Sequence, residues 1–445
     1  MEKTQREMGR PRFKEEIEFM DLPWGIICSI LSRLPLKSIG QFMCVSKSFC
    51  GIKNDSYFVE LHMRNAKFQP VNYILKEIPE FAEFRKQFYF PTENPDISRD
   101  DQDKTLYLVG EEKENMNMTK IQIIDELRHE TLRLVGSCNG LLCFSRGKDD
   151  RLSESIIIYN PITREYMQVP ATSSNVGPMY SAFNVRISFV FDAISRKYKL
   201  VVIHCVNRYG KGLEAYILTL GEDSWRIWKL SSELQFRKFS EDEKSVLFNG
   251  SLYWIVENIT GSAPMRVLLS MEISSEKFQV ISMNDPILQN PPTPCTHYFL
   301  LNSGNSLELA VHDYSDKQKR MNVWVLVDTK RGIWRHQSTH YLGRFLEYKK
   351  DPKKFPCKKK IEMSDPEYYN CRMKKNAGGD SLLVEYDYFD ESLRDTTYIL
   401  GPGLRHLVCY TPREKRFSID FHSDTEIPDF FDIFTFWPSF VSPKF

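Results

Sequence analysis

The stretch LFNGSLYW, residues 247–254, predicts a tight β-hairpin, because Asn249-Gly250 lies between apolar residues that suit strands. Both central residues of a type I′ turn need positive φ, which Asn and Gly tolerate best. The same signal occurs in VGSCNGLLCF at 135–144, and a related one occurs in FLLNSGNSLELAV at 299–311. Between the first two, FVFDAISRKYKLVVI at 189–203 also predicts a strand, a turn and a strand. The hairpin signal therefore recurs about every 55 residues.

A second turn signal recurs at nearly the same interval, except that the last spacing, of 83 residues, is longer because it contains a lysine-rich stretch that is expected to be a loop insertion. A polar residue opens the turn, and an aromatic residue six positions later closes it. The cases are Asn160 to Tyr166, Thr219 to Trp225, Glu272 to Phe278, Asp328 to Trp334 and Thr411 to Phe417. Each period thus holds two hairpin turns and about four short strands, a pattern typical of a propeller blade.

The repeats predict an all-β propeller of about six four-stranded blades. Radial stacking would bury the sheet faces that a single four-stranded sheet leaves exposed. Five blades are expected near 131–170, 187–230, 246–282, 299–337 and 380–420, and a strand pair at 105–125 is expected to complete the ring with the C-terminus. The aromatic residues that suit packing between blades are Trp225, Tyr253, Trp254, Trp324 and Trp334. The alternative is an irregular all-β sandwich.

The N-terminal part has a different periodicity, close to 3.6 residues, in MDLPWGIICSILSRLPLKSIGQFMCVSKSF at 20–49. One predicted helix face, spaced i, i+3, i+4 and i+7, comprises Ile27, Ile30, Leu31 and Leu34. Pro35 ends this helix and starts a second one, a short third helix follows Val45, and a fourth begins at Asp55. An all-α unit of roughly 45 residues is small for independent stability, so it would gain from docking onto a partner.

Composition narrows the function classes. The formal net charge of +1 gives no reason to expect nucleic acid or an acidic membrane as a partner. No apolar run approaches the roughly 18–20 residues that span a bilayer. The ten cysteines include no CxxC pair, which indicates reduced thiols in an intracellular protein. We therefore expect a location in the cytoplasm, the nucleus or both.

The chain shows no pattern typical of catalysis. It has no GxSxG, P-loop or HExxH motif, and we expect no cofactor and no metal. His336 and His340 are interpreted as hydrogen-bonded or exposed residues rather than metal ligands. Asn160, Asp192 and Asp328 each open a turn, so their side chains are expected to accept hydrogen bonds from nearby backbone.

At the N-terminus the chain resembles the F-box. The residues that carry the resemblance are Leu22-Pro23, Ile30 to Ser38, Cys44 to Ser48 and Phe58 to His62. The downstream part resembles the kelch-like β-propeller, or F-box-associated domain, of plant F-box proteins, through VGSCNGLLCF, YNPITREYMQVP, SFVFDAISRKYKLVVI, YILTLGEDSWRIWKL and SVLFNGSLYWIV. The expected domains are an F-box at 17–64, a linker at 65–104, the propeller at 105–424 and an aromatic tail at 425–445. The tail is expected to fold back on the propeller, with a docking segment as the alternative.

The resemblance implies a non-catalytic, substrate-recognition subunit of a Skp–cullin–F-box ubiquitin ligase. The F-box would bind a Skp-type adaptor and, through it, cullin and RING subunits, while the propeller captures an unidentified target protein for ubiquitination and proteasomal degradation. Carried over by position, the adaptor contacts would be Leu22, Pro23, Ile27, Ile30, Leu31, Leu34, Pro35, Val45, Lys47 and Phe49. The chain departs from the family at Phe49, where Trp is usual, and at Cys50, where a basic residue is usual.

Two other functions stay open on the sequence. The departure at Phe49 and Cys50 leaves room for an adaptor-bound scaffold or inhibitor that acts outside a ligase. A propeller enzyme, such as a glycan hydrolase, would need carboxylates that converge from several blades, and the sequence shows acids only at turns. The lysine-rich stretch at 348–360 is expected to be a solvated loop, with a nuclear-import signal or a site for an acidic partner as alternatives.

Overall fold

The chain forms two compact units, Met1–Gln69 with Pro438–Val441, and Pro70–Trp437 with Ser442–Phe445. We call them the helical unit and the β-unit. The computed structural model describes residues 22–45, 47–66, 72–77, 105–112, 115–127, 132–146, 156–170, 185–205, 213–230, 236–239, 245–259, 264–283, 296–313, 316, 320–341, 369–375, 382–388, 405–411, 416–421 and 431–444. The lysine-rich stretch at 348–360 lies outside the described residues.

The helical unit has the four helices that the sequence predicts. They are α1 (Trp24–Leu31), α2 (Leu36–Val45), α3 (Lys47–Cys50) and α4 (Ser56–Ala66), with a short 3₁₀ helix, η2 (Ile52–Asn54), before α4. Pro23 and Pro35 each stand directly before a helix, where a missing N–H costs nothing. Within the part of the chain that the structure describes, no helix is long and apolar enough to cross a membrane.

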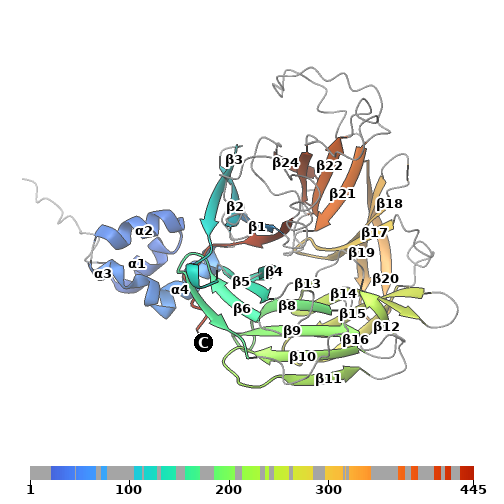
Figure 1. Cartoon of the computed structure of the whole chain (residues 1–445), viewed down its shortest axis with the longest axis horizontal. Coiled ribbons are helices and arrows are strands. Elements are labelled where there is room, and N and C mark those ends of the chain that lie inside the picture. Colours follow the sequence, from blue (N-terminus) through green and yellow to red (C-terminus); the bar gives the residue numbers. More distant parts are fainter. Residues whose placement is uncertain are drawn as a thin grey trace, which may run out of the picture. The chain divides into compact units, whose positions relative to one another are not determined.

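The described strands of the β-unit form six sheets, and they make a β-propeller (Figure 1). The first two complete blades are β4 (Leu132–Cys138), β5 (Leu141–Arg146), β6 (Ile156–Asn160), β7 (Glu165–Gln168), and β8 (Val185–Asp192), β9 (Lys197–Cys205), β10 (Leu213–Thr219), β11 (Arg226–Leu230). The third is β12 (Phe236–Phe239), β13 (Val246–Phe248), β14 (Ser251–Ile259), β15 (Pro264–Glu272), β16 (Phe278–Ser282). The fourth and fifth are β17 (Thr296–Asn302), β18 (Leu307–Asp313), β19 (Arg320–Asp328), β20 (Ile333–Tyr341), and β21 (Tyr369–Lys375), β22 (Leu382–Tyr388), β23 (Arg405–Thr411), β24 (Arg416–Phe421). The prediction of about six blades is confirmed.

The remaining blade joins the two ends of the chain. Its strand order is β25 (Phe431–Phe436), β1 (Asn72–Glu77), β2 (Thr105–Glu112) and β3 (Asn115–Gln122). The pair β2–β3 therefore completes the propeller together with the C-terminus, as expected. The structure also places β1 inside the segment assigned to a linker and β25 inside the segment assigned to an aromatic tail. The expectation that the tail folds back on the propeller is confirmed for β25, which pairs with β1.

The two turn signals mark one end of the blades. Asn139-Gly140 and Asn249-Gly250 have positive φ in all four residues, as type I′ turns require, and each pair joins the first two strands of its blade. The polar-to-aromatic turns join the third strand to the fourth, for example β6 to β7 and β19 to β20. In an antiparallel meander these two hairpins lie at the same end of the sheet, so we call this end of the propeller the turn face.

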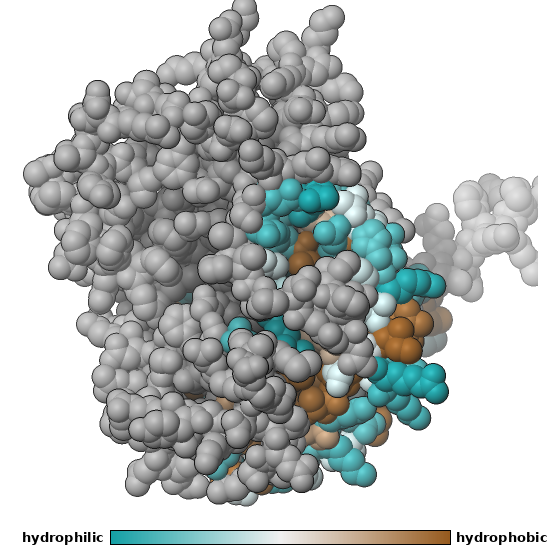
Figure 2. All heavy atoms as spheres, turned by 90° about the vertical axis from the view of Figure 1, so that its right-hand side faces the viewer, coloured by the Kyte–Doolittle hydropathy of each residue, from teal (hydrophilic) through white to brown (hydrophobic). Residues whose placement is uncertain are grey.

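The surface of the β-unit is mixed in character. On the side that Figure 2 shows, the described residues include hydrophilic groups (teal) interspersed with smaller hydrophobic ones (brown). Such scattered apolar residues are normal for a protein surface and do not by themselves mark a binding site.

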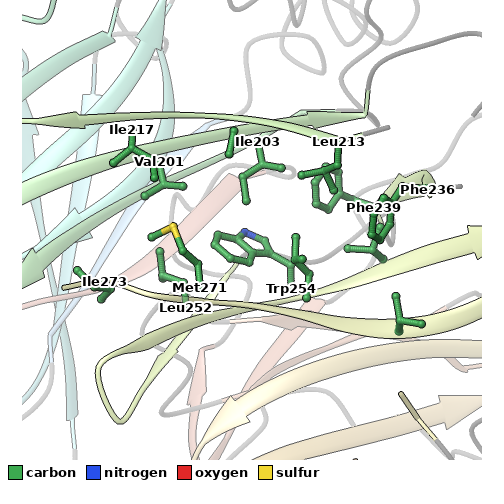
Figure 3. Packing of buried hydrophobic residues seen from close by; sticks show 14 of the residues in the cluster. Val201, Ile203, Leu213, Ile217, Phe236, Phe239, Leu252, Trp254, Met271 and Ile273 are labelled. Atoms are coloured by element: carbon green, nitrogen blue, oxygen red, sulfur yellow. The ribbon is translucent and has the colours of Figure 1, made fainter. Parts of the chain in front are cut away.

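Neighbouring blades are held together by apolar side chains, as Figure 3 shows for two of them. Trp254 of β14 is 1% exposed. Its ring points from the strand that it shares with Leu252 toward the strand that carries Val201 and Ile203, and Met271 lies beside it. The predicted packing aromatics Tyr253, Trp324 and Trp334 belong to the next cluster along the chain. Trp225 instead bridges two blades with its indole Nε1, which donates to the Pro170 carbonyl at 2.9 Å.

An ion network links two blades at the turn face. Lys199 Nζ lies 3.0 Å from Glu276 Oε1 and 3.4 Å from Asp192 Oδ2, and it donates to the Ile273 carbonyl at 2.7 Å. Arg226 holds the same Glu276 carboxylate through two hydrogen bonds of 3.0 and 2.6 Å. Glu276 belongs to the turn between β15 and β16, whereas its cationic partners belong to the β8–β11 blade. The network therefore fixes one blade against the next.

The network predicts a loss of stability in acid. Burial by itself raises the pKa of Glu276, but hydrogen bonds from Arg226 and Lys199 outweigh it, so the pKa lies below its usual value of 4.5. A carboxyl group with a lowered folded-state pKa contributes stability above its unfolded-state pKa, and this contribution is lost as pH falls through the folded-state value.

We therefore expect the free energy of unfolding, from urea titrations, to fall between about pH 5 and about pH 3. The fall should be smaller for Glu276→Gln, which cannot take up this proton. An equal fall in both proteins would contradict this origin of the acid sensitivity.

Candidate functional site

The helical unit has its own hydrophobic core. The buried members are Ile27, Cys28, Leu31, Ile39, Phe49, Ile52 and Phe58. Each of the four helices contributes at least one residue to this core, and so does η2. The short helices therefore stabilise one another. Burial raises the pKa of the Cys28 thiol, which keeps this sulfur neutral within the core.

Asp55 connects the first and last helices of the unit. Its Oδ1 accepts a hydrogen bond of 3.0 Å from the backbone N–H of Phe58 and so caps α4. Its Oδ2 accepts a bond of 2.8 Å from Trp24 Nε1 on α1. These hydrogen bonds, from the Phe58 backbone first and from Trp24 second, lower the pKa of Asp55. The carboxylate thus fixes the orientation of the Trp24 ring.

Three aromatic rings lie together on this unit. Phe49 is 4% exposed, and its ring centroid lies 6.3 Å from that of Trp24, in a stacked arrangement, and 6.2 Å from that of Phe42, edge to face. Trp24 is 41% exposed and Phe42 is at a similar level. The buried Phe49 ring therefore contacts two rings, those of Trp24 and Phe42, that are partly exposed to solvent.

Further large apolar side chains are exposed on the same two helices. Ile26 and Ile30 lie on α1 at i and i+4, and Val45, at the end of α2, is 83% exposed. We call Trp24, Ile26, Ile30, Phe42 and Val45 the exposed apolar group of the helical unit; Ile26 and Ile30 project from one side of α1 and Trp24 from another. Five such residues within about twenty positions on so small a unit are more than the scattered apolar residues of an ordinary surface.

The residues expected to contact an adaptor divide between surface and core. Ile30 and Val45 belong to the exposed apolar group, and Pro23 and Pro35 are exposed. Leu22 and Leu34 are half-buried and pack against the core, whereas Ile27, Leu31 and Phe49 lie within it. Lys47 lies in α3, and its side chain is outside the described part of the structure. The core residues hold the helices in place, and the exposed ones offer contact area.

Trp24, Ile26 and Phe42 were not among the expected contact residues. A signal for Trp24 and Ile26 was present, because six of the eight residues of α1 (WGIICSIL) are apolar. A helix of this kind that lies at a surface must leave some apolar side chains uncovered.

On the β-unit, the three acidic or amide turn residues make local hydrogen bonds. Asn160 Oδ1 accepts from the backbone N–H of Ile162 at 2.8 Å. Asp192 Oδ1 accepts from Ile194 at 3.0 Å, and Asp328 Oδ1 accepts from Lys330 at 2.8 Å. The interpretation of these residues as turn formers is confirmed.

The two spaced histidines of β20 have hydroxyl partners. His336 Nε2 lies 3.1 Å from Thr339 Oγ1, and His340 Nε2 lies 2.9 Å from Ser338 Oγ. Among the described residues, no group of three or more histidine, cysteine or acidic side chains is arranged to hold a metal ion. These side chains of the β-unit therefore have local structural roles. The exposed apolar group of the helical unit is the candidate site.

Two family patterns match the chain. Residues 97–360 match the F-box associated beta propeller domain, and residues 19–60 match the F-box domain. The first range falls within the β-unit and contains β2 to β20, and the second contains α1 to α3 and the first part of α4.

Similar proteins come from Arabidopsis thaliana. "Putative F-box protein At1g47730" is 25% identical over 344 residues, which are 75% of each chain. "Putative F-box protein At1g47790" is 22% identical over 348 residues, or 78% of each chain.

Among solved structures, an oligogalacturonate lyase from Vibrio parahaemolyticus has a TM-score of 0.34 at 9% identity and covers 72% of this chain and 74% of its own. A hypothetical selenium-binding protein from Sulfolobus tokodaii has a TM-score of 0.37 at 11% identity, with 78% of each chain covered. Likenesses of this size carry no argument about function.

Proposed function

Because the chain belongs to the F-box associated beta propeller domain family and also carries an F-box, we propose that it is the substrate receptor of a Skp–cullin–F-box ubiquitin ligase. The helical unit would bind the Skp-type adaptor, and the β-unit would capture the target protein. Cullin and RING subunits would join through the adaptor.

The observation that supports this proposal is the exposed apolar group of the helical unit. Exposed aromatic and aliphatic side chains are the usual anchors of a protein–protein interface, and a few of them supply most of the binding energy. The rings of Trp24 and Phe42 pack against the buried ring of Phe49, so their positions are fixed before a partner binds. A preorganised surface loses less side-chain entropy when it binds.

In this role the chain performs no bond chemistry. A receptor holds its target near a ubiquitin-loaded enzyme that is bound elsewhere in the complex. The gain comes from effective concentration and orientation. The hairpin turns of the propeller are rigidly built by side-chain-to-backbone hydrogen bonds, and loops presented by such a scaffold are suited to recognition.

The proposal predicts which variant loses the adaptor. In the full chain, the double substitution Ile30→Asp and Val45→Asp should weaken adaptor binding at least about 100-fold, because two carboxylates would be desolvated in an apolar interface. Isothermal titration with purified adaptor measures the loss. Both residues are exposed, so the folded state should be retained.

A matched control is Ile194→Asp. Ile194 is also exposed, but it lies in the turn between β8 and β9 of the β-unit, so its substitution should leave adaptor affinity unchanged. Equal affinity of the double variant and the parent chain would contradict the site. Co-purification of the adaptor without cullin would instead favour a scaffold or inhibitor outside a ligase.

A further inference from the structure

The helical unit includes four residues from the opposite end of the chain, Pro438–Val441. Phe440 packs against the same core that contains Phe58 of α4. Its ring centroid lies 6.4 Å from that of Phe58 and 5.8 Å from that of His62. The neighbouring Ser439 is 1% exposed, so this short segment is built into the unit and does not lie loosely on its surface.

His62 is adapted to this position. It is buried, and its ring lies 5.9 Å from Phe58 on the preceding turn of α4. Burial lowers its pKa, against a smaller opposing effect of a hydrogen bond with the Leu34 backbone. The neutral imidazole is thus one of three rings packed together, two from α4 and one from the C-terminal segment.

The C-terminal segment continues directly from the strand that closes the propeller. β25 pairs with β1 from Phe431↔Glu77 to Phe436↔Asn72. Only Trp437 lies between the last residue of β25 and Pro438. One stretch of about ten residues therefore gives a strand to the β-unit and a core side chain to the helical unit.

We propose that Pro438–Val441 is a clasp that completes the core of the helical unit, so that the adaptor-binding surface is fully stable only when the C-terminus is in place. The helical unit is small, and units of this size depend strongly on each added apolar contact. Phe440 supplies such a contact from outside the F-box sequence itself. The step from core stability to adaptor binding rests on the function proposed above.

The test is hydrogen exchange in the full chain with Phe440→Ala. We expect amides of α4 and α1 to exchange about tenfold faster, because local opening of the unit becomes more frequent. Amides of β9 and β10 should exchange as in the parent chain, which shows that the β-unit is still folded. Lys444→Ala, at an exposed residue of the same tail, is the matched control and should change neither group.

A second variant separates packing from loss of fold. Phe440→Leu keeps much of the apolar volume, so exchange in α4 should stay close to that of the parent chain. Unchanged exchange of α4 in Phe440→Ala would overturn the clasp.

Adaptor affinity, measured on the same proteins, should fall about tenfold for Phe440→Ala. If the parent chain fails to bind the adaptor, the proposed function is wrong, whereas faster exchange in α4 would still support the clasp.

Discussion

Replacing Lys199 with Met is expected to lower the free energy of unfolding by about 3 kcal/mol, because it leaves the buried Asp192 carboxylate without its Lys199 cation and removes one of the two cationic partners of Glu276. The side chain of Lys199 is 6% exposed, and that of Asp192 is 4% exposed. The Ile273 carbonyl would also lose its ammonium donor. Met has nearly the same length as Lys, so the loss would report charge and hydrogen bonding rather than a cavity.

Urea unfolding at pH 7 measures this effect, with Lys197→Met as the matched control. Lys197 is two residues away on the same strand but is exposed, so its substitution should change the free energy of unfolding by no more than about 0.5 kcal/mol. If Lys199→Met lowers the free energy of unfolding by less than about 1 kcal/mol, the network contributes no more than a solvent-exposed ion pair. That result would show that water screens these charges.

A triple variant refines the argument. Combining Lys199→Met with Asp192→Asn and Glu276→Gln removes the buried negative charges together with the cation. Part of the stability should return, since neutral amides cost less to bury than unpaired carboxylates. This non-additivity would measure the coupling within the network.

The network also illustrates what the sequence could not predict. Lys199, Arg226 and Glu276 are charged residues at or near turns, and such residues are normally solvated. The contact of two blades brings these charges together and buries Lys199, and no local pattern records which turn of one blade meets which strand of its neighbour. Asp192 was predicted as a turn former, which is correct, but its second role toward Lys199 was not predicted.

The blades themselves were predictable because their signals are local. Asn249-Gly250 tolerates the positive φ that a type I′ turn needs and adopts it here, and the residues on either side alternate as strands do. By contrast, β12 and β13 both pair with β14, one after the other along it. The polar stretch SEDEKS at 240–245 predicts a loop between them, but it does not reveal that both strands pair with β14. The pairing of β1 with β25 depends on segments from opposite ends of the chain, so their own sequences do not specify it.

In the helical unit, the positions of the helices were predictable, and the orientation of their faces was predictable in part. Pro23 and Pro35 mark helix starts, and Asp55 caps the last helix. Of the predicted face, Ile27 and Leu31 lie in the core and Leu34 packs against it, whereas Ile30 is 43% exposed. Periodicity alone does not decide which member of such a face stays uncovered. Contacts with α4, and for α4 itself with Phe440, decide it, and these are tertiary.

Gly332 is a position where one added methyl group should have a large effect. It lies in the turn between β19 and β20, at φ +64°, and a Cβ there would stand 1.9 Å from the Ser282 carbonyl oxygen at the end of β16. Gly332→Ala should therefore cost about 1–2 kcal/mol for the left-handed backbone. It should cost about 1–3 kcal/mol more for the overpacking, because a backbone atom must move away.

Gly250 is the matched control, since its φ is +73° and a Cβ there would meet nothing within 4 Å. Gly250→Ala should lose only the left-handed contribution. Asn tolerates this conformation but also carries a Cβ, so Gly250→Asn should be nearly neutral while Gly332→Asn stays destabilising. Urea midpoints of the four variants measure the comparison. Equal costs at the two positions would mean that the β19–β20 turn can move away from β16, and the close fit of these blades would then not constrain the propeller.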